Sequence, residues 1–314
     1  MGGATAEVTR QRAVAGGVLV VVAASVAAWS LASAQSALAA TLARAAADCA
    51  AVITLGLTAV PMLDIDRYRG ELIRRATVPL TVAGAVWLLA ELARVMLEAA
   101  EAAAVPVFRL GLHTATDFAL HTAAGGSVVF SAAAALVVVL AAAAVPRTAS
   151  ANLAVAGVAA LGVTARPLTG HLAESVIGGA AIVAHTLAAA MWCGTLAALV
   201  LTVEHRGQWA RVLPRFSQLS LGCVVVLLAG GVAGAVVALG SPAQLISTGY
   251  GRLMSAKVAV MAVLVVMAWR NRTMWVPAAR SHRTTAVVSR SRALTELAIM
   301  AVALTLAAAL AVTG

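Results

Sequence analysis

The sequence predicts an all-α membrane protein, a polytopic helical bundle of about nine transmembrane helices with the N-terminus inside and the C-terminus outside. Three observations lead to this fold class. Hydrophobic residues make up 62% of the 314 residues and charged residues only 11%, against about 25% in soluble domains. Apolar stretches of about 20 residues recur between short polar breaks, which is the length that crosses a bilayer. The positive charges gather in alternate breaks.

The apolar stretches define the expected helices. None shows the strict alternation typical of an outer-membrane barrel. We expect one membrane domain over residues 1–314, in which the fifth span is the shortest. The spans are expected near 13–33, 46–63, 76–99, 122–145, 152–165, 178–202, 217–240, 253–270 and 294–312.

The arginines fix the expected orientation. Nine spans that start inside place 16 Lys or Arg residues in inside segments and 6 in outside segments. An excess of positive charge marks the cytoplasmic side of a membrane protein. The inside set is Arg10, Arg12, Arg67, Arg69, Arg74, Arg75, Arg147, Arg206, Arg211, Arg215, Arg270, Arg272, Arg280, Arg283, Arg290 and Arg292. The outside set is Arg44, Arg94, Arg109, Arg166, Arg252 and Lys257.

The first apolar stretch has two interpretations. Arg10 and Arg12, an apolar run and then Ala32-Ser33-Ala34 are also typical of a signal peptide with a small-residue cleavage site. The run over 13–31 is longer than the core of most signal peptides, so a retained helix is favoured over a cleaved signal. The topology of the other helices is the same in both cases.

The net charge of +10 has a membrane explanation rather than a nucleic-acid one. Cytoplasmic loops account for the excess, and no basic patch is interleaved with aromatic residues, so we expect membrane lipid and no nucleic acid as partner.

The cysteines Cys49, Cys193 and Cys223 are widely spaced and form no C-x-x-C motif. Each is expected to be a small buried hydrophobic residue.

Ionisable side chains within a membrane are costly, so each is a candidate functional residue. His113, His121, His171 and His185 all fall in the expected outer half. His113, Asp117 and His121 follow at steps of four, which places them on one face of a helix. One metal ion can join an i, i+4 pair but not His113 and His121, which would lie about 12 Å apart. The alternative is an amphipathic outer helix whose polar face meets water.

The third span carries an acidic stripe near its outer end. Glu91, Arg94, Glu98 and Glu101 follow at helical spacing. An internal ion pair between Glu91 and Arg94 is the favoured interpretation. An acidic funnel that attracts a cation is the alternative.

The sixth span provides further candidate ligands. Gly170 and His171 precede it, and His185 lies roughly 10 Å below its outer end. Trp192 shares the His185 face, whereas Met191 points elsewhere. Two histidines on the same side of the membrane favour a shared metal ion, whereas a lone buried histidine is usually structural. Met254 and Met261 lie on one face of the eighth span, where packing is the favoured role.

These residues resemble the CopD (PcoD-type) copper-resistance family of bacterial inner-membrane proteins. The resemblance covers about residues 166 to 312, and residues 1–165 match only loosely. Three blocks and Glu296 carry it. They are Gly170-His171 with His185, Trp192 and Gly194; then Arg215-Phe216-Ser217 with Gly230 and Gly234; then Thr248-Gly249-Tyr250-Gly251-Arg252-Leu253 with Lys257, Asn271-Arg272 and Pro277.

The resemblance implies a multi-pass protein of the cytoplasmic (inner) membrane that handles copper. We expect capture of Cu(I) or Cu(II) at the extracytoplasmic side, then transport or delivery inward, with a periplasmic or other extracytoplasmic copper carrier as partner. Imidazole suits copper in both oxidation states, and thioether suits Cu(I). The candidate metal ligands are His171, His185, His121, His113, Asp117 and Met191.

Two other functions stay open at this point. His121 and His185 are suited to hold a haem between two helices, which would make a membrane redox protein. An assembly factor or scaffold that supplies copper to a respiratory oxidase would carry the same ligands as a transporter. We expect no enzymatic activity, because the sequence has no G-x-S-x-G, P-loop, H-E-x-x-H or G-x-G-x-x-G motif.

Overall fold

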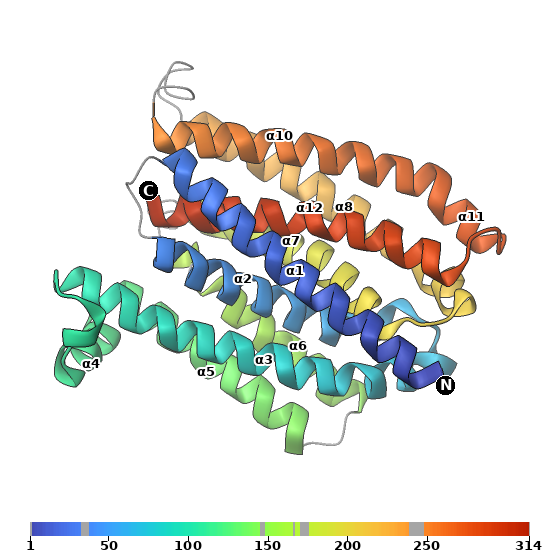
Figure 1. The fold of residues 1–314 in the computed structure, drawn as a ribbon, viewed down its shortest axis with the longest axis horizontal. Coiled ribbons are helices and arrows are strands. Elements are labelled where there is room, and N and C mark those ends of the chain that lie inside the picture. Colours follow the sequence, from blue (N-terminus) through green and yellow to red (C-terminus); the bar gives the residue numbers. More distant parts are fainter. Residues whose placement is uncertain are drawn as a thin grey trace.

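The chain folds into a bundle of roughly parallel and antiparallel helices (Figure 1). The computed structural model describes residues 2–32, 38–144, 148–165, 167–169, 176–238 and 248–313, and this part contains no strand. Within it, eight helices are long and apolar enough to cross a membrane. They are α1 (Gly2–Ala32), α2 (Leu38–Ala59), α3 (Asp66–Ala102), α5 (Ala123–Ala144), α7 (Val176–Thr202), α8 (Arg206–Ala238), α10 (Gly249–Arg270) and α12 (Ala286–Thr313).

Shorter elements complete the bundle. The apolar helix α6 (Ala149–Thr164) corresponds to the expected short fifth span, and its 16 residues give a length of about 24 Å. The outer helix α4 (Leu112–His121) joins α3 to α5. The remaining elements are η1 (Val60–Leu63), η2 (Val107–Arg109), η3 (Pro167–Thr169), the π-helical turn η5 (Asn271–Trp275) and α11 (Val276–Arg280).

Several helices extend beyond the apolar spans that we expected. The third span was expected at 76–99, whereas α3 covers Asp66–Ala102. The seventh was expected at 217–240, whereas α8 begins at Arg206. Arginine has a helix propensity close to that of leucine, so a basic segment continues a helix out of the membrane. Hydropathy therefore located the apolar part of each helix rather than its full length.

The helix α2 is the centre of the bundle. It packs against α1, α3, α6, α7 and α12, and 72% of its apolar window is buried. Small residues allow this, because they let two helix backbones approach closely. Gly56 of α2 and Gly194 of α7 face each other, and a Cβ added at either one would overlap backbone atoms of the other helix. The contact holds the first half of the chain against the second.

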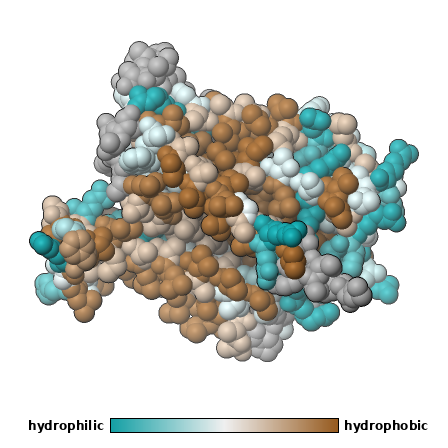
Figure 2. Space-filling model, in the orientation of Figure 1, coloured by the Kyte–Doolittle hydropathy of each residue, from teal (hydrophilic) through white to brown (hydrophobic). Residues whose placement is uncertain are grey.

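The two ends of the bundle differ in polarity. Hydrophobic residues cover the middle of the visible face, and hydrophilic residues gather at the end that carries the N-terminus and α11 (Figure 2). We call this the basic end, because Arg12, Arg67, Arg206, Arg280 and Arg292 lie in the segments that meet there. The end that carries α4, the first turn of α7 and the C-terminus is called the histidine end.

Ion pairs tie the helices together at the basic end. Asp64, which is 1% exposed, accepts from Arg211 Nε and Nη2 at 3.0 Å each, and its carbonyl oxygen accepts from Arg215 at 2.7 Å. The Arg211 guanidinium also lies 4.1 Å from the ring centroid of Tyr68. These contacts fix the start of α8 against the α2–α3 connection.

A second set of ion pairs links more distant segments of the same end. Glu204 pairs with Arg75 of α3 at 2.7 Å and with Arg10 of α1 at 3.9 Å. Arg75 also pairs with Glu71 at 2.8 Å. Two helices that are far apart in the sequence, α1 and α3, are thereby joined through the α7–α8 connection.

Candidate copper site

The histidines of α4 lie at the surface of the histidine end. His113, Asp117 and His121 are all exposed, whereas Ala115 on the opposite side is buried against α3 and α5. Asp117 Oδ1 lies 2.9 Å from His121 Nδ1, so these two side chains share one helix face, as their spacing predicts. The amphipathic interpretation and the metal half-site both stay open for this face.

His185 occupies a different position, inside the bundle on α7. Its ring is half-buried, and its Nδ1 atom is buried with no hydrogen-bond partner among the described residues. Gly230 of α8 faces the ring, and a Cβ added there would lie 2.9 Å from Nδ1. Because glycine has no side chain, Gly230 places no side-chain atom against Nδ1 of His185. Lys257 of α10 is close enough for its positive charge to act on the imidazole.

The α4 histidines and His185 lie on helices with mostly different neighbours. α4 packs on α3 and α5, whereas α7 packs on α2, α6, α8 and α12 and also contacts α3. Over the described ranges, no group of three or more His, Cys, Asp or Glu side chains is arranged to hold a metal ion. His171 lies outside the described residues, so a site shared by His171 and His185 stays a prediction.

Sulfur atoms follow His185 along α7. Met191 is half-buried and packs against the main hydrophobic core. Cys193 is buried next to Gly194, where α7 touches α2, and its thiol is free. These two residues lie about 9 Å and about 12 Å beyond His185 along the helix axis. Met254 and Met261 of α10 pack against hydrophobic clusters, which agrees with their expected packing role.

The acidic stripe of α3 is an internal ionic network. Arg94 is 1% exposed, and it donates to Glu91 at 3.0 Å and to Glu98 at 2.6 Å. Ser131 of α5 donates to the same Glu91 carboxylate at 2.8 Å, and the Trp87 indole donates to it at 3.3 Å. The expected Glu91–Arg94 ion pair is present. Every polar group of this network has a partner, which makes it a structural contact between α3 and α5.

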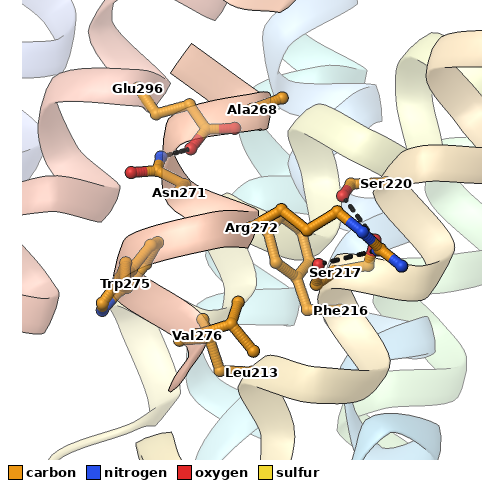
Figure 3. Close-up of a pocket in the computed structure, with 10 residues that line it drawn as sticks. All are labelled: Leu213, Phe216, Ser217, Ser220, Ala268, Asn271, Arg272, Trp275, Val276 and Glu296. Carbon is orange, nitrogen blue, oxygen red and sulfur yellow. Dashed lines mark hydrogen bonds between the residues drawn. The ribbon is translucent and has the colours of Figure 1, made fainter. Parts of the chain in front are cut away.

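Glu296 and Asn271 form a second polar contact inside the bundle. Glu296 of α12 is 2% exposed and accepts a hydrogen bond from the Asn271 side chain in η5 (Figure 3). From the sequence alone, Glu296 and Asn271 stand out only as matches to a family. A lone acidic residue in the last apolar span was the available signal, because such residues are rare in membrane helices.

Comparisons with known proteins identify the family. The family model "Copper resistance protein D" matches residues 210–310. The model "Copper resistance protein D-like, N-terminal domain" matches residues 34–179, so the first half of the chain also has a counterpart in the family. Comparison with curated proteins and with solved structures gave no match. With two matches that follow each other along the chain, and with eight apolar helices long enough to span a bilayer, the chain belongs to the copper resistance protein D family of multi-pass membrane proteins.

Proposed function

We propose that the protein binds copper at the histidine end of the bundle and moves or delivers it across the cytoplasmic membrane, with the basic end in the cytoplasm. Family membership supports the link to copper. The distribution of arginines supports the orientation, because positively charged segments stay on the cytoplasmic side. Copper is the cargo of this proposal, and no chemical reaction is assigned to the protein.

His185 is the observation that carries the proposal. A half-buried imidazole whose Nδ1 has no partner among the described residues is suited to bind a metal ion. Met191 and Cys193 lie deeper on the same helix, and thioether and thiolate are the ligands that Cu(I) prefers. A transported ion needs ligands at successive depths, and α7 offers nitrogen first and sulfur afterwards.

The exposed histidines of α4 have a separate role in this proposal. His113, His121 and Asp117 are the first groups that copper, or a periplasmic or other extracytoplasmic copper carrier, would meet at the histidine end. His121 lies on α4, whereas His185 faces Gly230 of α8. This placement favours copper over the haem alternative, which needs both rings on one haem.

A binding measurement tests the proposal. Purified protein is loaded with Cu(I) under a reductant, or with Cu(II), and bound copper per chain is determined for wild type, His185→Ala and His205→Ala. His205 is an exposed residue between α7 and α8 at the basic end, so it is a matched control. We expect His185→Ala to lose copper and His205→Ala to keep it. Equal copper content in all three proteins would refute the assignment of His185.

Transport and delivery need a second measurement. An assembly factor that supplies a respiratory oxidase would bind copper without accumulating it in a sealed compartment. Copper accumulation in proteoliposomes distinguishes the two roles. We expect the protein to accumulate copper, as a transporter does.

A further inference from the structure

Glu296 is a buried carboxyl group to which the copper proposal assigns no role. It lies in α12, near the start of the apolar part of this helix, and is 2% exposed. Over the described ranges it forms no ion pair with an arginine, lysine or histidine. Its described hydrogen bond comes from the neutral amide of Asn271. An ionised carboxylate without a counter-charge is so unfavourable in a low-dielectric interior that the group takes up a proton.

The helices packed around α12 do not compensate the charge of Glu296. These helices are α1, α2, α7, α8 and α10. On α7, Cys193 is near enough to interact electrostatically with Glu296, and the Trp192 indole lies close to the carboxyl group without meeting hydrogen-bond geometry. No ionisable side chain in the described parts of α1, α2, α8 or α10 acts on Glu296. Arg292, one helical turn before it on α12, is exposed.

A small cavity lies beside the carboxyl group. Residues of α8, α10, η5, α11 and α12 line it, and they include Glu296, Asn271, Ser217 and Ser220 (Figure 3). Its volume of about 10 Å³ is close to the room that one water molecule requires. A carboxyl group, an amide and two hydroxyl groups are the kind of partners that hold such a water.

Arg272 borders the cavity but is directed away from Glu296. Its Nη1 atom donates to the carbonyl oxygen of Ser217 at 3.0 Å and to the Ser217 hydroxyl at 3.1 Å (Figure 3). The arginine therefore caps the α8 side of the cavity and leaves the carboxyl group without a cationic partner. The π-helical turn η5 supplies both Asn271 and Arg272, and π-turns occur frequently at functional sites.

Asn271 also borders a second, larger hollow that lies at the basic end. This hollow has a volume of about 200 Å³, and Arg270, Arg292 and Thr295 are among its lining residues. Asn271 is common to both spaces, so it lies between Glu296 and the basic end. The amide of Asn271 is the polar group that the two spaces share.

We infer that Glu296 is a proton-binding site, a carboxyl group that carries a proton at neutral pH and exchanges it with water at the basic end through the cavity beside Asn271. The ligand is the proton itself. Glu91 shows the opposite arrangement, because its carboxyl group faces the Arg94 guanidinium and accepts from two further donors, Ser131 and Trp87. The two glutamates are thus matched in burial and differ in charge compensation.

Infrared spectroscopy of the full-length protein in liposomes, without added copper, tests this inference. A protonated carboxyl group gives a carbonyl-stretch band that an ionised one lacks. We expect the wild type to show such a band at neutral pH, to lose it at alkaline pH, and to shift it in D₂O. Glu296→Gln should remove the band, whereas Glu91→Gln should keep it. Asn271→Ala should move the frequency of the band, because the amide donates to this carboxyl group.

Two results would overturn the inference. One is a wild type without a protonated carboxyl band at neutral pH, a result that does not depend on whether a variant folds. The other is a folded Glu296→Gln protein, shown by an unchanged elution profile, that keeps the band. Because no copper is present, either failure leaves the copper proposal intact. The loss of copper expected for His185→Ala does not depend on the protonation of Glu296.

Discussion

The two ends of the bundle are stabilised in different ways. At the basic end, buried and half-buried ion pairs join α1, α3 and α8 through residues such as Asp64, Arg211 and Glu204. At the histidine end, the polar side chains of α4 are exposed, and His185, about 14 Å further into the bundle along α7, keeps an unpartnered nitrogen among the described residues. Polar groups that satisfy one another fix a structure, whereas groups left open are available to a ligand. This difference supports the proposal that the histidine end receives copper.

The largest expected effect on stability is at the basic end. Asp64→Ala removes the carboxylate that accepts from Arg211 and leaves the Arg211 charge at a partly buried position, whereas the carbonyl oxygen that accepts from Arg215 is kept. Breaking a buried ion pair from one side typically costs about 3 to 5 kcal/mol. We expect a lower midpoint of thermal unfolding in detergent, followed by tryptophan fluorescence. Asp66→Ala is the control, because Asp66 forms an exposed ion pair with Arg69. Equal destabilisation by both changes would contradict the comparison.

The buried ionic network of α3 is expected to have the next largest effect. Glu91→Gln keeps a side chain that Ser131 can bind but removes the charge opposite Arg94. We expect the protein to lose about 2 kcal/mol of stability. The same thermal measurement checks this value. Copper content should be unchanged, and a loss of copper would favour the acidic-funnel alternative for this stripe.

His185 is the central test at the histidine end. His185→Ala should weaken copper binding at least about tenfold, which is about 1.4 kcal/mol. Titration with a competing copper chelator of known affinity measures the change. Thermal stability should be little affected, because Nδ1 makes no hydrogen bond in the described structure. If His185→Ala caused a large loss of stability and no change in copper affinity, His185 would be a packing residue and not a copper ligand.

A change at Lys257 is expected to have the smallest effect on copper affinity. The informative result is whether the affinity rises or falls. Its charge acts on His185, and a positive charge near a metal ligand disfavours a bound cation. Lys257→Gln should therefore strengthen copper binding by about threefold. The same chelator titration measures it, with Arg252→Gln as a control on the same helix. Weaker binding would show that the lysine has another role in the site.

Much of the fold could be predicted from the sequence, because hydropathy acts over whole segments. Apolar runs such as 122–145 and 178–202 gave helices that begin and end within two residues of those positions. The basic extensions of α3 and α8 were not predicted. Arginine continues a helix well, but it lowers the mean hydropathy by which a membrane span is located. The approach of Gly56 to Gly194 was also unpredictable, because it depends on which helices become neighbours.

The candidate site was predictable in part. The i, i+4 pair of Asp117 and His121 and the Glu91–Arg94 pair follow from helical periodicity within one element, and both are present. Whether His185 meets other ligands depends on tertiary packing, which one sequence does not specify. The contact of Glu296 with Asn271 joins positions 25 residues apart on two elements, and for that reason it emerged only from the structure.

Sided copper uptake shows whether the protein moves copper inward from the histidine end. Proteoliposomes are sorted by the accessibility of a tag at the N-terminus, so that the histidine end faces the outer solution, and copper inside the vesicles is then measured over time. The account predicts accumulation by wild type and His205→Ala, and a rate at least about tenfold lower for His185→Ala. Accumulation by His185→Ala at the wild-type rate would contradict it.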